Sequence, residues 1–210
     1  GNRCLPCPLK METKEKFTLG LELPSDPRWV NIAEKHVRDI LIDHAYCEQK
    51  AASSCISLII LHPDRQKLVE ALTPIVAEEW DHFTRVLQEL RKRGYTLGPQ
   101  RKDEYIEQLS KIMKKGGSRE QQLVEKLLLN ALIEARSCER FKALWKNIAD
   151  PDLAEFYYEL MVSEAGHYKT FLHLAMEYMD AEKVMHRWRE WLHQEAEILR
   201  ELGVRGDRIH

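Results

Sequence analysis

The chain has 210 residues and a formal net charge of −2, with 44% hydrophobic and 31% charged residues. This length suits one domain whose core is large enough to need no disulfide or metal staple. The near-neutral charge argues against a general binder of polyanions, so contact with nucleic acid would require a local basic patch. With 9 Gly and 8 Pro in the chain, the composition favours an all-helical protein.

The first 28 residues are predicted to be irregular, because Pro24 and Pro27 interrupt them and no helical period is visible. Cys4 and Cys7 form a C-x-x-C pair in this segment. Without a second such pair, we interpret them as part of an irregular terminus rather than a zinc or redox site. No apolar run reaches membrane-spanning length and no secretory signal is visible, so we expect a cytoplasmic protein without membrane association.

Residues 29–210 are expected to form one helical domain. A first helix from about Trp29 to Leu61 ends before Pro63, and a second helix over residues 64–93 ends at Gly94. So short a link predicts an antiparallel hairpin. The five cysteines of the chain are an odd number, and those within the helical patterns are predicted to be reduced, packed thiols.

The second half of the chain repeats this organisation. A longer connection contains a short helix around residues 103–115, and two helices over 118–147 and 151–178 follow it. A final amphipathic helix is predicted over 181–202. Two helical hairpins joined by a long crossover are the connectivity of a ferritin-like four-helix bundle, here with an additional C-terminal helix.

Each of the four long helices carries an apolar stripe at steps of three and four residues, and each stripe contains acidic or histidine side chains. These interior polar residues are Glu48, then Glu79 and His82, then Glu134, then Glu164 and His167. The spacing Glu-x-x-His occurs a third time, at Glu190 and His193, but this pair lies off the apolar stripe of its helix. We therefore expect the third pair to be solvated and structural.

Four carboxylates in a core would each cost several kcal/mol without a counter-cation, on the order of the penalty for a buried unpaired charge. This favours a dinuclear metal site over a hydrogen-bonded polar cluster. Mostly oxygen donors with four negative charges suit two divalent iron or manganese ions. Two carboxylates are expected to bridge the ions, and the sequence leaves open which. Asp43 and Arg136 are predicted to orient the ligands, since each could reach a neighbouring helix at the level of the site.

The connection between the two hairpins is rich in basic residues. It predicts a surface patch that contacts nucleic-acid phosphates, with a solvated crossover as the alternative. The basic residues are Arg91, Lys92, Arg93, Arg101, Lys102, Lys111, Lys114, Lys115 and Arg119, against three acidic residues in the same range.

Ligand spacing alone leaves iron storage, peroxide reduction, radical generation, desaturation and hydroxylation open, because one fold hosts many activities. Four segments are more specific, since together they resemble the tRNA 2-methylthio-N6-isopentenyladenosine hydroxylase family. They are "LIDHAYCEQKAAS" (41–53), "EEWDHFTRVLQELRKRG" (78–94), "IEARSCERFKAL" (133–144) and "FYYELMVSEAGHY" (156–168).

The resemblance implies a non-haem di-iron monooxygenase that hydroxylates the isopentenyl side chain of the modified adenosine next to the anticodon. It implies two iron ions, O2 as co-substrate, tRNA as substrate and a separate reductase that supplies electrons. The family's metal ligands map onto Glu48, Glu79, His82, Glu134, Glu164 and His167. The alternative is a ferritin-like ferroxidase, an iron-storage protein or a peroxide-reducing protein. The oligomeric state stays open.

Overall fold

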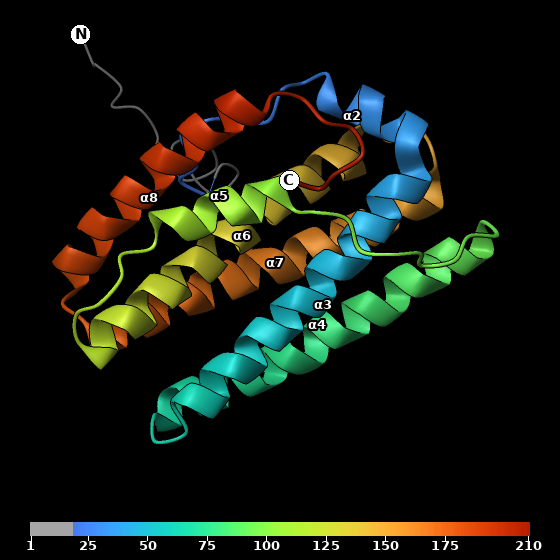
Figure 1. Ribbon diagram of the computed structural model, residues 1–210. Coiled ribbons are helices and arrows are strands. Elements are labelled where there is room, and N and C mark those ends of the chain that lie inside the picture. Colours follow the sequence, from blue (N-terminus) through green and yellow to red (C-terminus); the bar gives the residue numbers. More distant parts are fainter. Residues whose placement is uncertain (1–18) are drawn as a thin grey trace, which may run out of the picture.

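A computed structural model describes residues 19–210, which form an all-helical molecule (Figure 1). Cys4 and Cys7 lie outside the described residues. The first hairpin consists of α3 (Val37–Leu61) and α4 (Gln66–Lys92). Helix α4 ends where Gly94 adopts a positive φ of 75°, a conformation that favours glycine over residues with a side chain.

The crossover and the second hairpin follow the predicted order. The short helix α5 (Glu104–Ile112) begins at Asp103, whose side chain accepts a hydrogen bond from the Ile106 amide. Helix α6 (Arg119–Asn147) begins with a capping box at Ser118, and α7 (Pro151–Tyr178) begins at Asp150, which caps two amides. Because these caps satisfy the first free N–H groups, each helix starts at a defined residue.

Helix α8 (Ala181–Leu202) is the additional C-terminal helix, and it packs against α5 and α6. Its apolar stripe is buried through Val184, Trp188 and Trp191. The residues after α8 turn back toward the first hairpin, where Ile209 is fully buried. The fold is therefore a ferritin-like four-helix bundle with α8 and a C-terminal segment added to one side.

The predicted continuous helix from Trp29 to Leu61 is wrong at its beginning. The structure divides it into α2 (Trp29–Ala33), a 3-10 turn (Glu34–His36) and α3, and His36 leaves the helical region with φ −128° and ψ 35°. No proline or glycine marks this break. Its physical reason is tertiary, because the Trp29 ring is buried beneath Arg140, 4.5 Å from the guanidinium carbon, and its indole N–H donates to the Arg205 carbonyl.

The predicted stripes are buried, and they create a polar layer between two apolar clusters. One cluster contains Cys55, Leu58 and Phe171, and the other contains Ala45, Phe83 and Leu160. On α3 and α7 the interior carboxylates and the imidazole come between these positions. Cys47, Cys55 and Cys138 are free thiols, which confirms the prediction for the helical cysteines within residues 19–210. Over the same residues, each helix is too short or too polar to cross a membrane.

Candidate metal centre

Six side chains from four helices meet in the polar layer of the bundle. None of the six exposes more than 6% of its surface. They are Glu48 from α3, Glu79 and His82 from α4, Glu134 from α6, and Glu164 and His167 from α7. The structure thus brings together all six residues that the sequence singled out.

The six residues form two overlapping groups, in each of which the possible ligand atoms lie within 4.8 Å of one another. The first group adds Glu48 and His82 to a shared pair of carboxylates, and the second adds Glu134 and His167 to the same pair. The shared pair is Glu79 and Glu164, one from each Glu-x-x-His sequence. This is the arrangement expected where two carboxylates each reach two ions.

Both imidazoles turn Nδ1 toward the carboxylates. His82 Nδ1 lies 3.4 Å from a Glu79 oxygen, 3.5 Å from Glu48 and 3.7 Å from Glu164. His167 Nδ1 lies 2.7 Å from Glu79 and 3.8 Å from Glu134. Each imidazole nitrogen therefore faces carboxylate oxygens from more than one helix.

Several of these buried atoms have no hydrogen-bond partner. They include both carboxylate oxygens of Glu79, Oε2 of Glu134, and Nδ1 of His82 and of His167. Even the 2.7 Å approach of His167 Nδ1 to Glu79 lacks hydrogen-bond geometry. Because buried polar atoms are costly when unpaired, atoms that converge without bonding to one another fit shared coordination of a cation.

The pKa values of the clustered side chains also fit a site that holds cations. Burial and the neighbouring Glu79 raise the pKa of Glu48 and of Glu134 well above the usual value. Burial opposes the charged form of His167, but Glu134 and Glu79 raise its pKa to about 12. For His82, Glu48 and Glu79 outweigh burial and raise the pKa to about 10. The four carboxylates cannot all be ionised at this distance unless cations balance them, and two divalent ions would do so. The fold and this donor set fit a di-iron site.

A buried histidine that the sequence analysis missed holds Glu48 in place. His44 Nε2 lies 2.7 Å from Glu48 Oε1, and His44 Nδ1 lies 3.3 Å from the Tyr157 hydroxyl. Burial and the neighbouring His82 lower the pKa of His44 to about 3, so the ring is neutral. When Glu48 is ionised, the neutral ring donates from Nε2 to the carboxylate and accepts at Nδ1, so in that state the Tyr157 O–H donates to His44. His44 falls within the helical stripe pattern one turn before Glu48, and this spacing was the available signal.

A second contact orients His167 from outside the cluster. Its Nε2 lies 2.5 Å from Glu78, an exposed carboxylate on α4, while Nδ1 faces inward. Metal-binding histidines commonly donate their outer N–H to a carboxylate, which fixes the ring orientation. Glu78 lies off the apolar stripe of α4 and is exposed, and the structure gives it this contact with His167.

Asp43 and Arg136, the residues predicted to orient the ligands, bind other groups. Asp43 accepts a hydrogen bond from the Ile209 amide at 2.8 Å and pairs with Arg208. Arg136 pairs with Glu195 on α8 at 2.8 Å. Both are buried, and these contacts anchor the C-terminal segment and α8 to the bundle.

The nine basic residues of the crossover do not form a single cluster. The crossover runs the length of the bundle in Figure 1, so residues 91–93 and residues 114–119 lie at opposite ends. Six of the nine have acidic partners, for example Arg93 with Asp150 and Arg101 with Asp207. Among described residues, Arg91, Lys111 and Lys115 have no ion pair.

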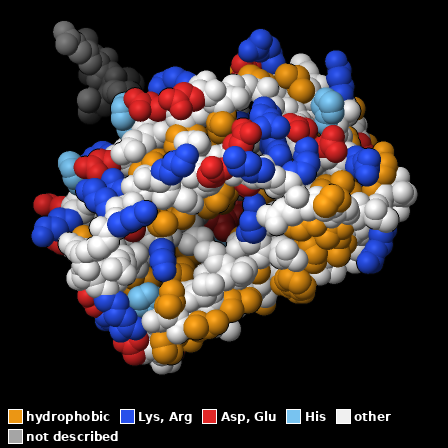
Figure 2. Space-filling view, viewed as in Figure 1, with side chains coloured by type: hydrophobic (Ala, Val, Ile, Leu, Met, Phe, Trp, Pro, Cys, Tyr) orange, Lys and Arg blue, Asp and Glu red, His pale blue; other side chains and the backbone are white. Residues whose placement is uncertain are grey.

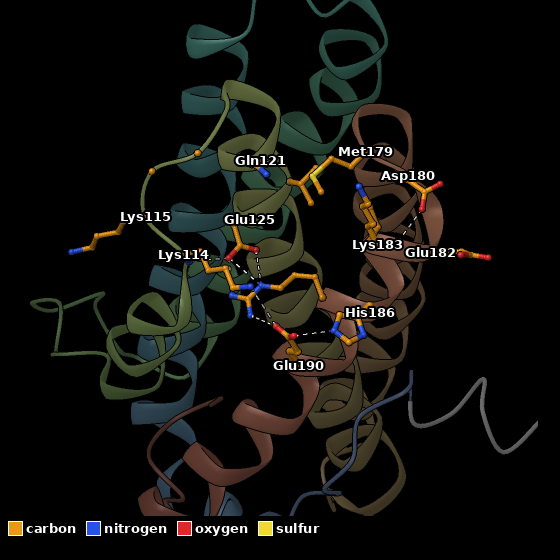
Figure 3. A pocket seen from close by; sticks show the side chains of 15 residues that line it. Lys114, Lys115, Gln121, Glu125, Met179, Asp180, Glu182, Lys183, His186 and Glu190 are labelled. Atoms are coloured by element: carbon orange, nitrogen blue, oxygen red, sulfur yellow. Dashed lines mark hydrogen bonds and ion pairs between the residues drawn. The ribbon is translucent and has the colours of Figure 1, made fainter.

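The third Glu-x-x-His pair lies on α8 beside a cavity of about 560 Å³ that none of the six clustered residues lines. Figure 3 shows Glu190 at this cavity, linked to His186. Glu190 also pairs with Arg187 at 2.8 Å, whereas His193 pairs with Glu22. The predicted solvated pair is thus confirmed as a set of surface ion pairs.

Comparisons with curated proteins identify two relatives of the same name, "tRNA 2-(methylsulfanyl)-N(6)-isopentenyladenosine(37) hydroxylase". The Pseudomonas putida relative is 37% identical over 160 residues, which cover 76% of this chain and 77% of the relative. The Salmonella typhimurium relative is 33% identical over 139 residues, which cover 65% of this chain and 49% of that protein. The chain therefore spans about half the length of the second relative.

A solved structure with the same fold is that of "Protein 43 with aldehyde deformylating oxygenase activity from Synechococcus". It matches with a TM-score of 0.85 and 33% sequence identity, over 90% of this chain and 94% of that chain. The sequence model of one family, described as tRNA-(MS[2]IO[6]A)-hydroxylase (MiaE), matches residues 11–210. With this match over nearly the whole chain, and with the buried Glu and His cluster in place, the chain belongs to the tRNA-(MS[2]IO[6]A)-hydroxylase (MiaE) family.

Proposed function

We propose that the protein is a non-haem di-iron monooxygenase that hydroxylates the isopentenyl side chain of 2-methylthio-N6-isopentenyladenosine in tRNA, next to the anticodon. The observation that carries the proposal is the pair of overlapping carboxylate and imidazole groups that share Glu79 and Glu164. Family membership and the names of the two relatives supply the substrate class. A tRNA substrate fits a cytoplasmic location.

The six clustered residues would hold two iron ions. Glu79 and Glu164 would help to hold both ions, because each belongs to both groups, and Glu48 and Glu134 would each belong to one side. Bound iron would supply the activation of O2 and the removal of hydrogen from an allylic C–H bond. One oxygen atom enters that bond and the other leaves as water, so each turnover takes up two electrons and two protons. A separate reductase would deliver the electrons.

The chain's own contribution is to hold the ligands still and to keep water away. His44 fixes one carboxylate orientation through its 2.7 Å contact with Glu48, and Glu78 fixes the ring of His167. Apolar side chains lie on both sides of the polar layer. A dry surrounding strengthens electrostatic interactions and suppresses side reactions with solvent.

The basic crossover would contact the phosphates of the anticodon stem-loop. The target base must leave its stack to reach a site inside a helical bundle. Proteins can turn a base out of its stack in this way when it lies in a single-stranded loop. Arg101 and Lys102 directly precede Asp103, which lines a pocket that reaches Glu134. The middle of the basic set is therefore next to a pocket that reaches Glu134.

The proposal is tested with the iron-loaded protein, an electron donor, O2 and tRNA that carries 2-methylthio-N6-isopentenyladenosine. Nucleoside mass analysis should show the gain of one oxygen atom in the isopentenyl group. With 18O2 the label should enter the product, because O2 supplies the new oxygen. Label that comes only from water, or no product with a competent donor, would contradict the proposal.

Two alternative activities are tested with the same protein preparation. A long-chain aldehyde tests the aldehyde deformylating oxygenase activity for which the Synechococcus protein is named. Iron uptake without tRNA tests the ferroxidase and storage alternative, which would also produce a large protein shell in native mass measurements. Conversion of the aldehyde, or mineral formation, in place of tRNA hydroxylation would replace the proposed function with that activity.

A further inference from the structure

A pocket of about 150 Å³ leads from the surface to the metal ligands. It lies between α3, the beginning of α5 and α6, and Glu134 is one of its lining residues. Figure 2 shows a hollow on this face of the molecule with acidic side-chain atoms at its bottom. Contacts between the two hairpins are made chiefly by α4 and α7, on another side of the bundle. The gap between α3 and α6 is thus the side on which the cluster can be reached.

Most of the exposed surface inside this pocket is apolar, although polar side chains also line it. Ala51 from α3, Ile106 from α5, and Leu129 and Ile133 from α6 line it, and each is half-buried. Half-buried aliphatic side chains around a buried carboxylate expose apolar surface that a ligand can cover. The pocket therefore suits an apolar group that must approach Glu134.

The volume restricts what can enter. Pockets that enclose drug-sized ligands have about 300 to 1,000 Å³. An aliphatic cavity of about 150 Å³ is known to bind benzene, which has six carbon atoms. A branched five-carbon chain fits such a space, whereas a whole nucleoside does not.

The polar lining residues include His210, Ser54 and Asn130, the last two joined by a hydrogen bond, and an ion pair that faces solvent. Lys50 on α3 and Asp103 at the start of α5 both line the pocket, and their side chains form an ion pair of 2.8 Å that bridges the two elements. The Lys50 side chain is 36% exposed, so this pair is in contact with solvent. A base outside the pocket would meet this polar rim while an apolar substituent extends inward.

We propose that this pocket is the binding site for the prenyl substituent of the modified adenosine, with the isopentenyl chain against Ala51, Ile106 and Ile133 and the adenine ring at the rim. The inference rests on the proposed function. Ile106 then limits the length of chain that the enzyme accepts, because its side chain occupies part of the wall that a longer chain would contact. The cavity beside Glu190 is larger but has charged walls and no ligand residue.

The first test compares two prenyl lengths on the same stem-loop, a five-carbon isopentenyl group and a ten-carbon geranyl group. Ile106→Ala should raise the kcat/KM ratio of geranyl to isopentenyl about tenfold, since a few methylene groups change discrimination by about this much. Ile112→Ala is the matched control, because it is the same substitution in α5 at a half-buried position away from the pocket. It should leave the ratio unchanged.

The second test measures binding rather than turnover. The protein should bind an isopentenylated anticodon stem-loop about tenfold or more tightly than the same stem-loop with unmodified adenosine, because several buried CH2 groups contribute. Ala51→Phe should fill the pocket and bring this ratio close to one. Ala71→Phe, at a half-buried position on α4, should preserve it.

The outcomes separate this inference from the proposed function. If wild type hydroxylates the isopentenyl group, but Ile106→Ala leaves the length ratio unchanged and Ala51→Phe keeps the binding ratio, the prenyl group binds elsewhere and this inference is wrong. If iron-loaded wild type converts neither substrate and does not distinguish the two stem-loops, the proposed function fails and the inference fails with it.

Discussion

The bundle core and α8 carry the same short sequence pattern, and they use it for different purposes. In the core, His82 and His167 face carboxylates from several helices and share Glu79 and Glu164. On α8, Glu190 pairs with Arg187 and His186, while 61% of the His193 side chain is exposed. The pattern Glu-x-x-His alone therefore does not identify a ligand pair.

The two regions differ in whether the Glu-x-x-His pair lies on the apolar stripe of its helix. In α4 and α7 the stripe continues through both the Glu and the His, so helix packing forces them inward. In α8 the stripe consists of Val184, Trp188 and Trp191, and Glu190 lies beside it. In α4 and α7, burial removes water as a hydrogen-bond partner. Only groups from another helix or a cation can then pair with the Glu and His side chains.

The largest expected effect is on metal content. Glu134→Ala should lower bound iron well below two ions per chain, because it removes one of the four side chains of the second group that could hold an ion. Glu190→Ala should keep the iron content of wild type and cost about 1 kcal/mol or less in stability, as for exposed ion pairs. Metal analysis of the two purified variants checks this difference, and equal iron content in both would remove the distinction between core and α8.

His82→Ala extends this prediction to turnover. It should abolish hydroxylation while the affinity for tRNA changes little, because His82 is buried among carboxylates and does not reach the surface. Single-turnover product analysis and a tRNA binding assay measure the two quantities separately. A parallel loss of both would indicate that the variant fails to fold rather than that it lacks a ligand.

The next effect concerns the contact behind Glu48. His44→Phe keeps an aromatic ring next to Phe141 and Tyr157 but removes both hydrogen bonds. Activity or metal affinity should fall about 10-fold to 100-fold, the usual cost of losing a group that orients a ligand. Tyr157→Phe removes only the outer hydrogen bond and should cost less. His173→Phe, on the exposed surface of α7, is the control.

A smaller effect is expected on stability, and its sign should reverse when the metal is removed. Without iron, Glu134 is a buried carboxyl whose Oε2 has no hydrogen-bond partner. An unsatisfied buried polar group costs about 1–3 kcal/mol, so Glu134→Ala should be at least as stable as wild type in chelator and less stable in iron. Thermal unfolding in both conditions tests this reversal. Lower stability of the variant in both conditions would mean that Glu134 is needed mainly for packing.

The sequence predicts the bundle and the six clustered residues because a single physical signal, the period of apolar residues, determines both. It does not predict the break at His36, where no proline or glycine interrupts the helix and burial of Trp29 decides the direction of the chain. It also misassigns polar residues just outside the cluster. Asp43 and His44 are adjacent on α3, but Asp43 binds the C-terminal segment, whereas His44 faces Glu48 one turn along the same helix.

The sequence also does not predict the pocket. Its wall combines residues of α3, α5 and α6, and the position of α5 against the other two helices follows from tertiary packing. Asp103 could be identified as a helix cap, but its pair with Lys50 joins residues 53 positions apart. Long-range ion pairs of this kind follow from the fold, and local sequence patterns do not encode them.

The smallest expected effect concerns tRNA binding at the far end of the crossover. Neutralising Arg91, Lys92 and Arg93 together should weaken binding and flatten its dependence on salt, since each lost phosphate contact lowers the logarithmic slope by about 0.7 to 0.9. The effect should stay below that of three full contacts, because Lys92 and Arg93 already pair with Glu89.

The matched control neutralises three exposed basic residues outside the crossover, Lys67, Lys169 and Arg189. Both triple variants lose the same net charge, so a general electrostatic attraction would change the slope equally in both. A larger change in the crossover variant would assign phosphate contacts to the end of α4. An equal change would leave only the part of the crossover next to Asp103 as the docking surface, where the pocket opens toward Glu134.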